Sequence, residues 1–199
     1  MSLRTAQAAA LLAATVTTGL MAGVFGLYAH AIMRGLGHTD DRTFVRAFQS
    51  IDRAIINPLF MLSFFGALLF SGAAVVLQVR GDVRTALPWV VVACGLNLVV
   101  VIITMAVHLP LNDAIKAANP GGVAEFATVR HNFHEGRWVA WNVVRVVAIT
   151  AALGCLTWSL VLHGRSTAVA AATSPTTSSS AGVPLPPPVS ALAREPIAR

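Results

Sequence analysis

The sequence predicts an all-α integral membrane protein: a bundle of four membrane-spanning helices followed by a disordered C-terminal tail. Of the 199 residues, 56% are hydrophobic and only 11% are charged, whereas about a quarter of the residues in a soluble domain are charged. Mean hydropathy is +0.72, and the chain contains four apolar stretches long enough to cross a bilayer, which takes roughly 20 helical residues. The lipid bilayer is therefore the first expected partner.

The first span is predicted over residues 8–33, because no charged residue lies between Arg4 and Arg34. A secretory signal is the competing interpretation, but the apolar core of such a signal has only about 7 to 15 residues. Small residues share one face of this helix with His30, so that a neighbouring helix can approach closely. His30 then lies at the helix end, either as a ligand-binding side chain or as an interfacial one.

Residues 34–54 form a charged connector that contains a predicted short helix. Asp40 can cap its first turn, and Phe44 and Phe48 repeat at helical spacing. A helix with one apolar and one basic face is typical of the membrane surface, where we expect this one to lie.

The second span is predicted over residues 55–78 and opens with Asn57-Pro58. Proline is well tolerated in a first turn, and an asparagine before it can cap the exposed amide groups. Asn57 is therefore a candidate binding residue with capping as the alternative role.

The third span is predicted over residues 86–107. Asn97, Thr104 and His108 share one of its faces, because separations of seven and eleven residues return to nearly the same direction. Such a polar stripe must face protein or trapped water, since lipid offers no hydrogen-bond partner. Pro110 is expected to end this helix.

The connector at residues 109–137 contains a predicted short helix at 123–133 and the pair His131 and His134. Two histidines three residues apart could ligate a metal, but no firm third ligand accompanies them, so that solvated side chains are the expected outcome. We predict no metal site and no cofactor site.

The fourth span, residues 138–163, places Trp138, Trp141, Asn142 and Arg145 on one face directed into the bundle. Arg145 lies about 10 Å along the helix from Trp138. A lipid-facing guanidinium at that depth would be costly, so that an intramembrane arginine is a functional candidate. Snorkelling to the head groups is the alternative.

The membrane domain is thus predicted to comprise residues 1–163, and residues 164–199 form the tail. The tail is rich in Ser, Thr, Ala and Pro and has no periodic apolar face, which is typical of disorder. The net charge of +6 is dispersed through the loops, and no nucleic-acid partner is expected.

Four spans place the connectors 34–54 and 109–137 on the same side of the membrane. His30, Asn57, His108 and Arg145 consequently approach one end of the bundle, beneath the two connectors. We expect the functional site at that end.

Five motifs occur in order along the chain: Gly35-Leu36, Asp40-Asp-Arg-Thr-Phe-Val45, Ile51-Asp-Arg-Ala-Ile-Ile-Asn-Pro-Leu-Phe60, Pro110-Leu-Asn112 and Trp138-Val-Ala-Trp-Asn-Val-Val-Arg145. Together they resemble the DUF1772 family of small four-helix membrane proteins, also described as anthrone oxygenase-like. The resemblance spans about residues 11–162, and Arg34 and His108 depart from the family pattern. The resemblance implies a four-helix bundle in a bacterial cell membrane and, from the fungal members, oxidation of an anthrone to an anthraquinone by molecular oxygen without a dedicated cofactor.

Two hypotheses follow. In the first, the protein oxidises a lipophilic anthrone or phenol: Arg145 stabilises an enolate-like anion, His108 acts as base, and Asn112 and Asn142 orient the substrate. The side chains expected to line the binding site are His30, Asn57, Trp138 and Trp141.

In the second, a non-catalytic membrane protein binds a lipid, a quinone or a partner subunit, and Arg145, Trp141 and Asn142 join helices. The enzyme requires a buried Arg145 beside an open cavity, whereas the second hypothesis requires Arg145 to be fully engaged by carbonyls or acids. A haem or metal held by His30 and His108 is a third idea.

Overall fold

The computed structural model describes residues 2–81 and 84–173, whose regular secondary structure is helical with no strand. This confirms the predicted all-α class. The elements, including two short π-helices labelled η, are α1 (Leu3–Leu27), η1 (Tyr28–Ile32), α2 (Met33–Gly37), α3 (Asp41–Ile55), α4 (Pro58–Val79), α5 (Leu87–Ile103), η2 (Thr104–His108), α6 (Leu109–Ala117), α7 (Val123–Phe133) and α8 (Glu135–Thr173).

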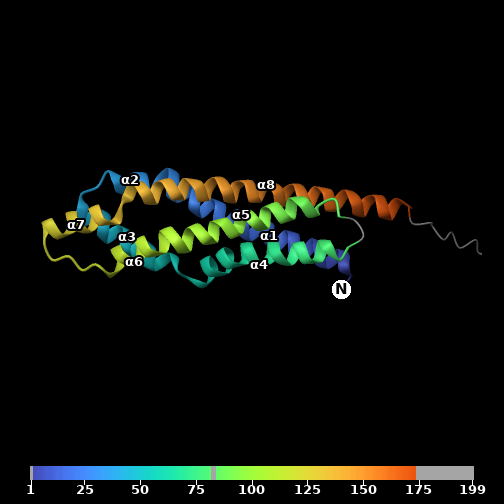
Figure 1. Ribbon diagram of the computed structural model, residues 1–199, viewed down its shortest axis with the longest axis horizontal. Coiled ribbons are helices and arrows are strands. Elements are labelled where there is room, and N and C mark those ends of the chain that lie inside the picture. Colours follow the sequence, from blue (N-terminus) through green and yellow to red (C-terminus); the bar gives the residue numbers. More distant parts are fainter. Residues whose placement is uncertain (1, 82–83, 174–199) are drawn as a thin grey trace, which may run out of the picture.

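Four helical segments are long and apolar enough to cross a membrane, as the sequence predicts. They are Leu3–Gly37, Pro58–Val79, Leu87–Ala117 and Val123–Ser166. In the bundle, α1 and α5 each pack against both α4 and α8. Figure 1 shows an elongated bundle with α3, α6 and α7 gathered at one end and the start of α1 at the other.

Two predicted helix caps are formed. The Asp40 carboxylate accepts hydrogen bonds from the Thr43 backbone amide (3.0 Å) and hydroxyl (2.6 Å) at the start of α3. At the start of α4, the Asn57 side-chain oxygen accepts from the Phe60 amide at 3.0 Å. Each cap satisfies an amide that would otherwise lack a partner within its helix.

Pro110 does not end the third span, contrary to the prediction. The helix continues through η2 into α6, and the Leu109 amide donates to the Thr104 carbonyl, five residues back. Proline has no amide hydrogen, and its ring clashes with the carbonyl four residues earlier in a regular α-helix. The wider π-turn before Pro110 loosens this part of the helix, so that the chain passes the proline without breaking.

The short helix α3 is also placed differently from the prediction. Its apolar face does not lie on the membrane surface: Phe44 and Phe48 are at most 2% exposed, and the Phe48 ring lies 4.6 Å from the ring of Phe133 in α7. Helices α3, α6 and α7 therefore form a packed cap over one end of the bundle, which we call the helical cap.

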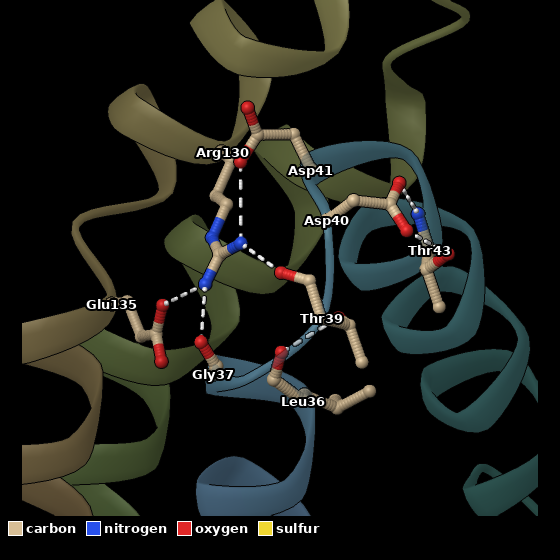
Figure 2. Close-up of polar contacts among 8 residues, drawn as sticks. All are labelled: Leu36, Gly37, Thr39, Asp40, Asp41, Thr43, Arg130 and Glu135. Atoms are coloured by element: carbon tan, nitrogen blue, oxygen red, sulfur yellow. Dashed lines mark hydrogen bonds and ion pairs between the residues drawn. The ribbon is translucent and has the colours of Figure 1, made fainter.

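Arg130 in α7 ties the helical cap together. Its Nη1 donates to the Thr39 carbonyl at 2.8 Å and to Asp41 at 3.2 Å. Its Nη2 donates to the Gly37 carbonyl and to Glu135, both at 3.2 Å. Figure 2 shows this one guanidinium joining the α2–α3 loop to the start of α8, which fixes the helical cap on the bundle.

The middle of the bundle contains a smaller polar cluster around Asn97, which is 1% exposed. The Asn97 amide donates to the Ala67 carbonyl at 3.1 Å and to the hydroxyls of Thr18 (3.3 Å) and Ser71 (3.4 Å). The predicted polar stripe thus joins α5 to α1 and α4 at this level, as interhelical hydrogen bonds within a membrane do.

The fourth helix extends beyond its expected end near His163, since α8 runs to Thr173. Residues 164–173 are therefore helical, where a disordered tail was predicted. Most of the predicted tail, residues 174–199, lies outside the described residues.

Candidate functional site

A cavity of about 240 Å³ lies beneath the helical cap, between α1, α3, α4, α8 and the η2–α6 segment. Most of its wall is apolar. The polar and ionisable side chains that line it are Tyr28, Asp52, Thr104, His108, Asn112, Lys116 and Arg145. The predicted convergence of His108 and Arg145 at this end of the bundle is therefore found in the structure.

Arg145 is 5% exposed, and its charge is held by neutral groups. Its Nη1 donates to the Thr104 hydroxyl at 3.1 Å, and its Nη2 donates to the side-chain oxygen of Asn142 at 2.8 Å. Its Nε has no hydrogen-bond partner, and Arg145 forms no ion pair within residues 2–81 and 84–173. The cavity wall thus contains a positive charge that no carboxylate compensates.

Aromatic rings complete the surroundings of this guanidinium. It lies 4.2 Å from the centre of the Phe25 ring and 5.7 Å from that of Trp138. Ring faces carry partial negative charge and attract a cation, by up to about 2 kcal/mol when desolvated. Asn142 holds the arrangement in place, because its amide also donates to the Phe25 carbonyl at 3.1 Å.

His108 presents a free nitrogen. The ring is 1% exposed, and its Nε2 lies 3.3 Å from the Trp138 carbonyl. Because a carbonyl can only accept, Nε2 of a neutral ring carries the hydrogen and Nδ1 carries the lone pair. Nδ1 is buried and has no hydrogen-bond partner among the described residues, so that the tautomer set by Trp138 leaves a proton acceptor unused.

A chain of hydrogen bonds crosses the end of the cavity nearest the helical cap. Trp138 Nε1 donates to the side-chain oxygen of Asn112, and the Asn112 amide donates to Asp52, both at 2.8 Å. Lys116 completes an ion pair with the other Asp52 oxygen at 3.1 Å. Lys116 also forms an ion pair with Asp113 at 3.0 Å, so that two carboxylates share this lysine.

Three predicted binding residues do not line the cavity. His30 is exposed, and the exposed Asn57 is occupied as the helix cap, where it also donates to the Ala54 carbonyl at 3.2 Å. Trp141 is 39% exposed, because it lies about 100° around the helix from Asn142 and the bundle faces the Trp138 and Asn142 side. Trp138 does line the cavity.

The sequence interpretation missed Tyr28, Asp52 and Lys116. A pattern for Asp52 was available, since it follows Phe48 by four residues and so lies on the apolar face of α3. Lys116 likewise follows Asn112 by four. Tyr28 is the only tyrosine in the chain, and its ring lies 5.7 Å from that of Trp138.

Both π-helical segments border the cavity. Tyr28 begins η1, and Thr104 and His108 begin and end η2. Single π-turns within α-helices are found frequently at functional sites, because the widened turn changes the direction of side chains.

In the described part of the chain, no group of three or more His, Cys, Asp or Glu side chains is arranged as metal ligands. The rings of His131 and His134 lie 6.3 Å apart in the helical cap. His30 and His108 differ in burial, and only His108 lines the cavity.

The family model described as anthrone oxygenase matches residues 59–155. This part of the chain is thus similar to the anthrone oxygenase family. The segment matching the anthrone oxygenase family contains His108, Asn112, Trp138 and Arg145, whereas Tyr28 and Asp52 precede it. No curated protein and no solved structure matches the chain.

Proposed function

We propose that the protein binds a lipophilic anthrone or phenol in this cavity and oxidises it with molecular oxygen. The observation that carries the proposal is the buried Arg145, which lines an open cavity without a carboxylate partner. Asp52 is paired with Lys116, whereas Arg145 donates to a hydroxyl and an amide oxygen. In surroundings of low dielectric constant, such a charge favours a ligand that is or becomes an anion.

The reaction would begin with removal of a proton from the anthrone methylene carbon. The lone pair on Nδ1 of His108 accepts it, and the electron pair left behind delocalises onto the carbonyl oxygen, where Arg145 stabilises the negative charge. The group that stabilises the developing charge, Arg145, and the group that takes the proton, His108, thus both line the cavity.

Oxygen is the oxidant and second substrate. The electron-rich carbon forms a bond to one oxygen atom of O₂, and the resulting peroxide, once protonated, loses water to leave a new carbonyl. One oxygen atom enters the anthraquinone and the other leaves as water with the two hydrogens of the methylene group. No further reductant is needed.

The asparagines act as positioning residues in this scheme. Asn142 holds the guanidinium of Arg145 through its side-chain oxygen, and Asn112 holds the Trp138 indole. Because protein partners occupy these atoms, we assign both asparagines to the orientation of the cavity wall, where the sequence interpretation had them orient the substrate directly.

A second candidate is non-catalytic binding of a lipid, a quinone or a partner subunit. The bonds from Arg145 to Thr104 and from Asn142 to the Phe25 carbonyl join α8 to η2 and α1. This bridging is the observation that favours an interhelical role for Arg145.

The test is anthraquinone formation by the protein purified in detergent, followed by absorbance after addition of anthrone in oxygenated buffer, with the protein-free rate subtracted. Arg145→Gln is compared with Arg137→Gln, an exposed arginine on the same helix. We expect acceleration by the wild-type protein and by Arg137→Gln, and a loss of about 100-fold in Arg145→Gln.

Two results would contradict the proposal. Absence of turnover across a panel of anthrones and phenols would favour the binding function. A fall in activity of Arg145→Gln that only follows a loss of folded protein, measured by thermal unfolding, would favour the interhelical role.

A further inference from the structure

The lining residues of the cavity differ sharply in exposure according to the element that carries them. Those from α8 are buried, and those from α1 and α3 are buried or half-buried. The exposed ones come from the start of α4 with its preceding linker and from the η2–α6 segment: Ile56 (52%), Met61 (39%), Phe65 (39%), Met105 (42%) and Leu109 (41%). The cavity therefore opens sideways, between α4 and η2–α6.

This side opening lies within the membrane-spanning segments. Phe65 follows the first residue of α4 by seven positions, which places it roughly 10 Å along the helix. Arg145 lies equally far from Trp138 on α8. The opening and the guanidinium are thus at similar depth, and the side chains at the opening are all apolar, as a surface facing hydrocarbon must be.

The end toward the helical cap is closed by polar contacts. The Asp52–Lys116 ion pair and the hydrogen bonds of Asn112 join α3, α6 and α8 across it. The side opening has no such bonds, and two of its side chains, Met61 and Met105, are unbranched and flexible. Movement of these side chains can admit a molecule, whereas passage from water requires an ion pair to be broken.

We propose that the cavity exchanges its ligand directly with the hydrocarbon interior of the bilayer through this side opening, and that it takes flat aromatic molecules dissolved in the membrane in preference to water-soluble ones. The proposal rests on the proposed function for the aromatic nature of the ligand. The route itself is independent of catalysis.

Trp138 offers a direct readout because it is 3% exposed and lines the cavity. In a Trp89→Phe, Trp141→Phe, Trp158→Phe background it is the sole tryptophan. The protein is reconstituted in phosphatidylcholine vesicles, and the rate of quenching of Trp138 fluorescence is followed after addition of either of two probes. The probes are anthraquinone, which partitions into the membrane, and anthraquinone-2-sulfonate, which stays in water.

The opening is narrowed by the double variant Met61→Phe, Met105→Phe. Its matched control is Leu69→Phe, Ile102→Phe, which enlarges exposed side chains of α4 and α5 that do not line the cavity. We expect the first pair to slow quenching by anthraquinone by about tenfold or more, because association must now await a rarer conformation. The control pair should change the rate by less than about twofold.

The polar end is tested with Asp52→Asn, which removes the ion pair to Lys116 and leaves no unpaired carboxylate at position 52 to repel an anionic probe. We expect anthraquinone-2-sulfonate to quench Trp138 slowly in the parent protein and faster in this variant.

Three results would overturn the proposal: unchanged anthraquinone quenching in the narrowed variant, equally fast quenching by both probes in the parent protein, or no quenching by anthraquinone at all. The readout requires no turnover. Rapid, opening-dependent quenching without anthraquinone formation from anthrone would therefore refute the proposed oxidation and leave the membrane route standing.

Discussion

Two arginines of this protein each lie over a phenylalanine ring, but only one of the two guanidinium groups is paired with carboxylates. Arg130 lies 4.3 Å from the centre of the Phe44 ring, and Arg145 lies 4.2 Å from that of Phe25. Arg130 also binds two carboxylates and two backbone carbonyls (Figure 2). Among the described residues, Arg145 donates to a hydroxyl and an amide oxygen and to no carboxylate.

The difference separates a structural arginine from a candidate functional one. In the helical cap, carboxylates neutralise the guanidinium of Arg130, so that no unpaired positive charge is left to attract a ligand. In the cavity, the low dielectric constant makes an uncompensated charge costly to keep, and a site that keeps one has strong attraction for an anion. Variants that exchange or remove these charges test this contrast.

The largest expected effect is on turnover in Arg145→Gln. Loss of the charge should lower the rate of anthraquinone formation by about 100-fold, while Arg130→Gln should retain most of the activity per folded molecule. Initial rates normalised to folded protein measure both. Equal losses in the two variants would remove the distinction between the arginines.

The second largest decrease in turnover is expected for His108→Phe. Phenylalanine keeps an aromatic ring beside Trp138 but has no nitrogen to accept a proton, so that turnover should fall by about 10- to 100-fold. The control is His131→Phe in the helical cap, where the side chain is exposed. A His108→Phe protein with wild-type rates would exclude His108 as the base.

For the free energy of unfolding, we expect the larger effect in Arg130→Gln and the smaller one in Arg145→Gln. It breaks ion pairs to Asp41 and Glu135, whose side chains are 42% and 29% exposed, and solvent screening limits the loss to about 1–2 kcal/mol. Denaturant unfolding in detergent, followed by circular dichroism, gives this value. We expect Arg145→Gln to lower the free energy of unfolding by less than this. A larger decrease in Arg145→Gln would support an interhelical role for Arg145.

A smaller loss of stability is expected for a substitution at Asn97, in the middle of the bundle. Asn97→Leu removes the hydrogen bonds to Ala67, Thr18 and Ser71, which in membrane proteins contribute about 0.6 kcal/mol each on average. Turnover should be unaffected, because Asn97 does not line the cavity. A loss of activity without a loss of stability would extend the site to this level of the bundle.

The smallest expected effect concerns the pH dependence of the helical cap. The hydrogen bonds from Thr43 hold the pKa of Asp40 below its usual value, because they favour the ionised carboxylate. Its contribution to stability is therefore complete above the usual pKa, about 4, and is lost as the pH falls through the lowered pKa. Melting temperatures at successive pH values should show a small acid shift that Asp40→Asn removes.

Much of the fold could be predicted because its signals are local. Charge-free stretches give the spans, and the caps at Asp40 and Asn57 follow from residue type and position. The helix at 123–133 was predicted with the bounds that the structure gives α7. Helix periodicity and topology were also sufficient to bring His108 and Arg145 to the same end.

The remaining features depend on contacts between elements. Asp52 and Lys116 become a pair only when α3 packs on α6, and that packing is not encoded in the period of either helix. The interpretation of α3 as a surface helix followed from its amphipathic pattern, which does not distinguish lipid from protein as the apolar partner. The passage of the chain through Pro110 required a π-turn, for which the sequence has no simple pattern.

The π-turn at η2 has a consequence for comparison between related chains. Each π-turn contains one residue more than the α-helical turn it replaces. A relative that lacks one residue within Thr104–His108 can therefore form a regular α-helical turn here and keep Asn112 and Lys116 on the side that faces Asp52. An alignment that places gaps only in loops would shift α6 of such a relative out of register by one residue.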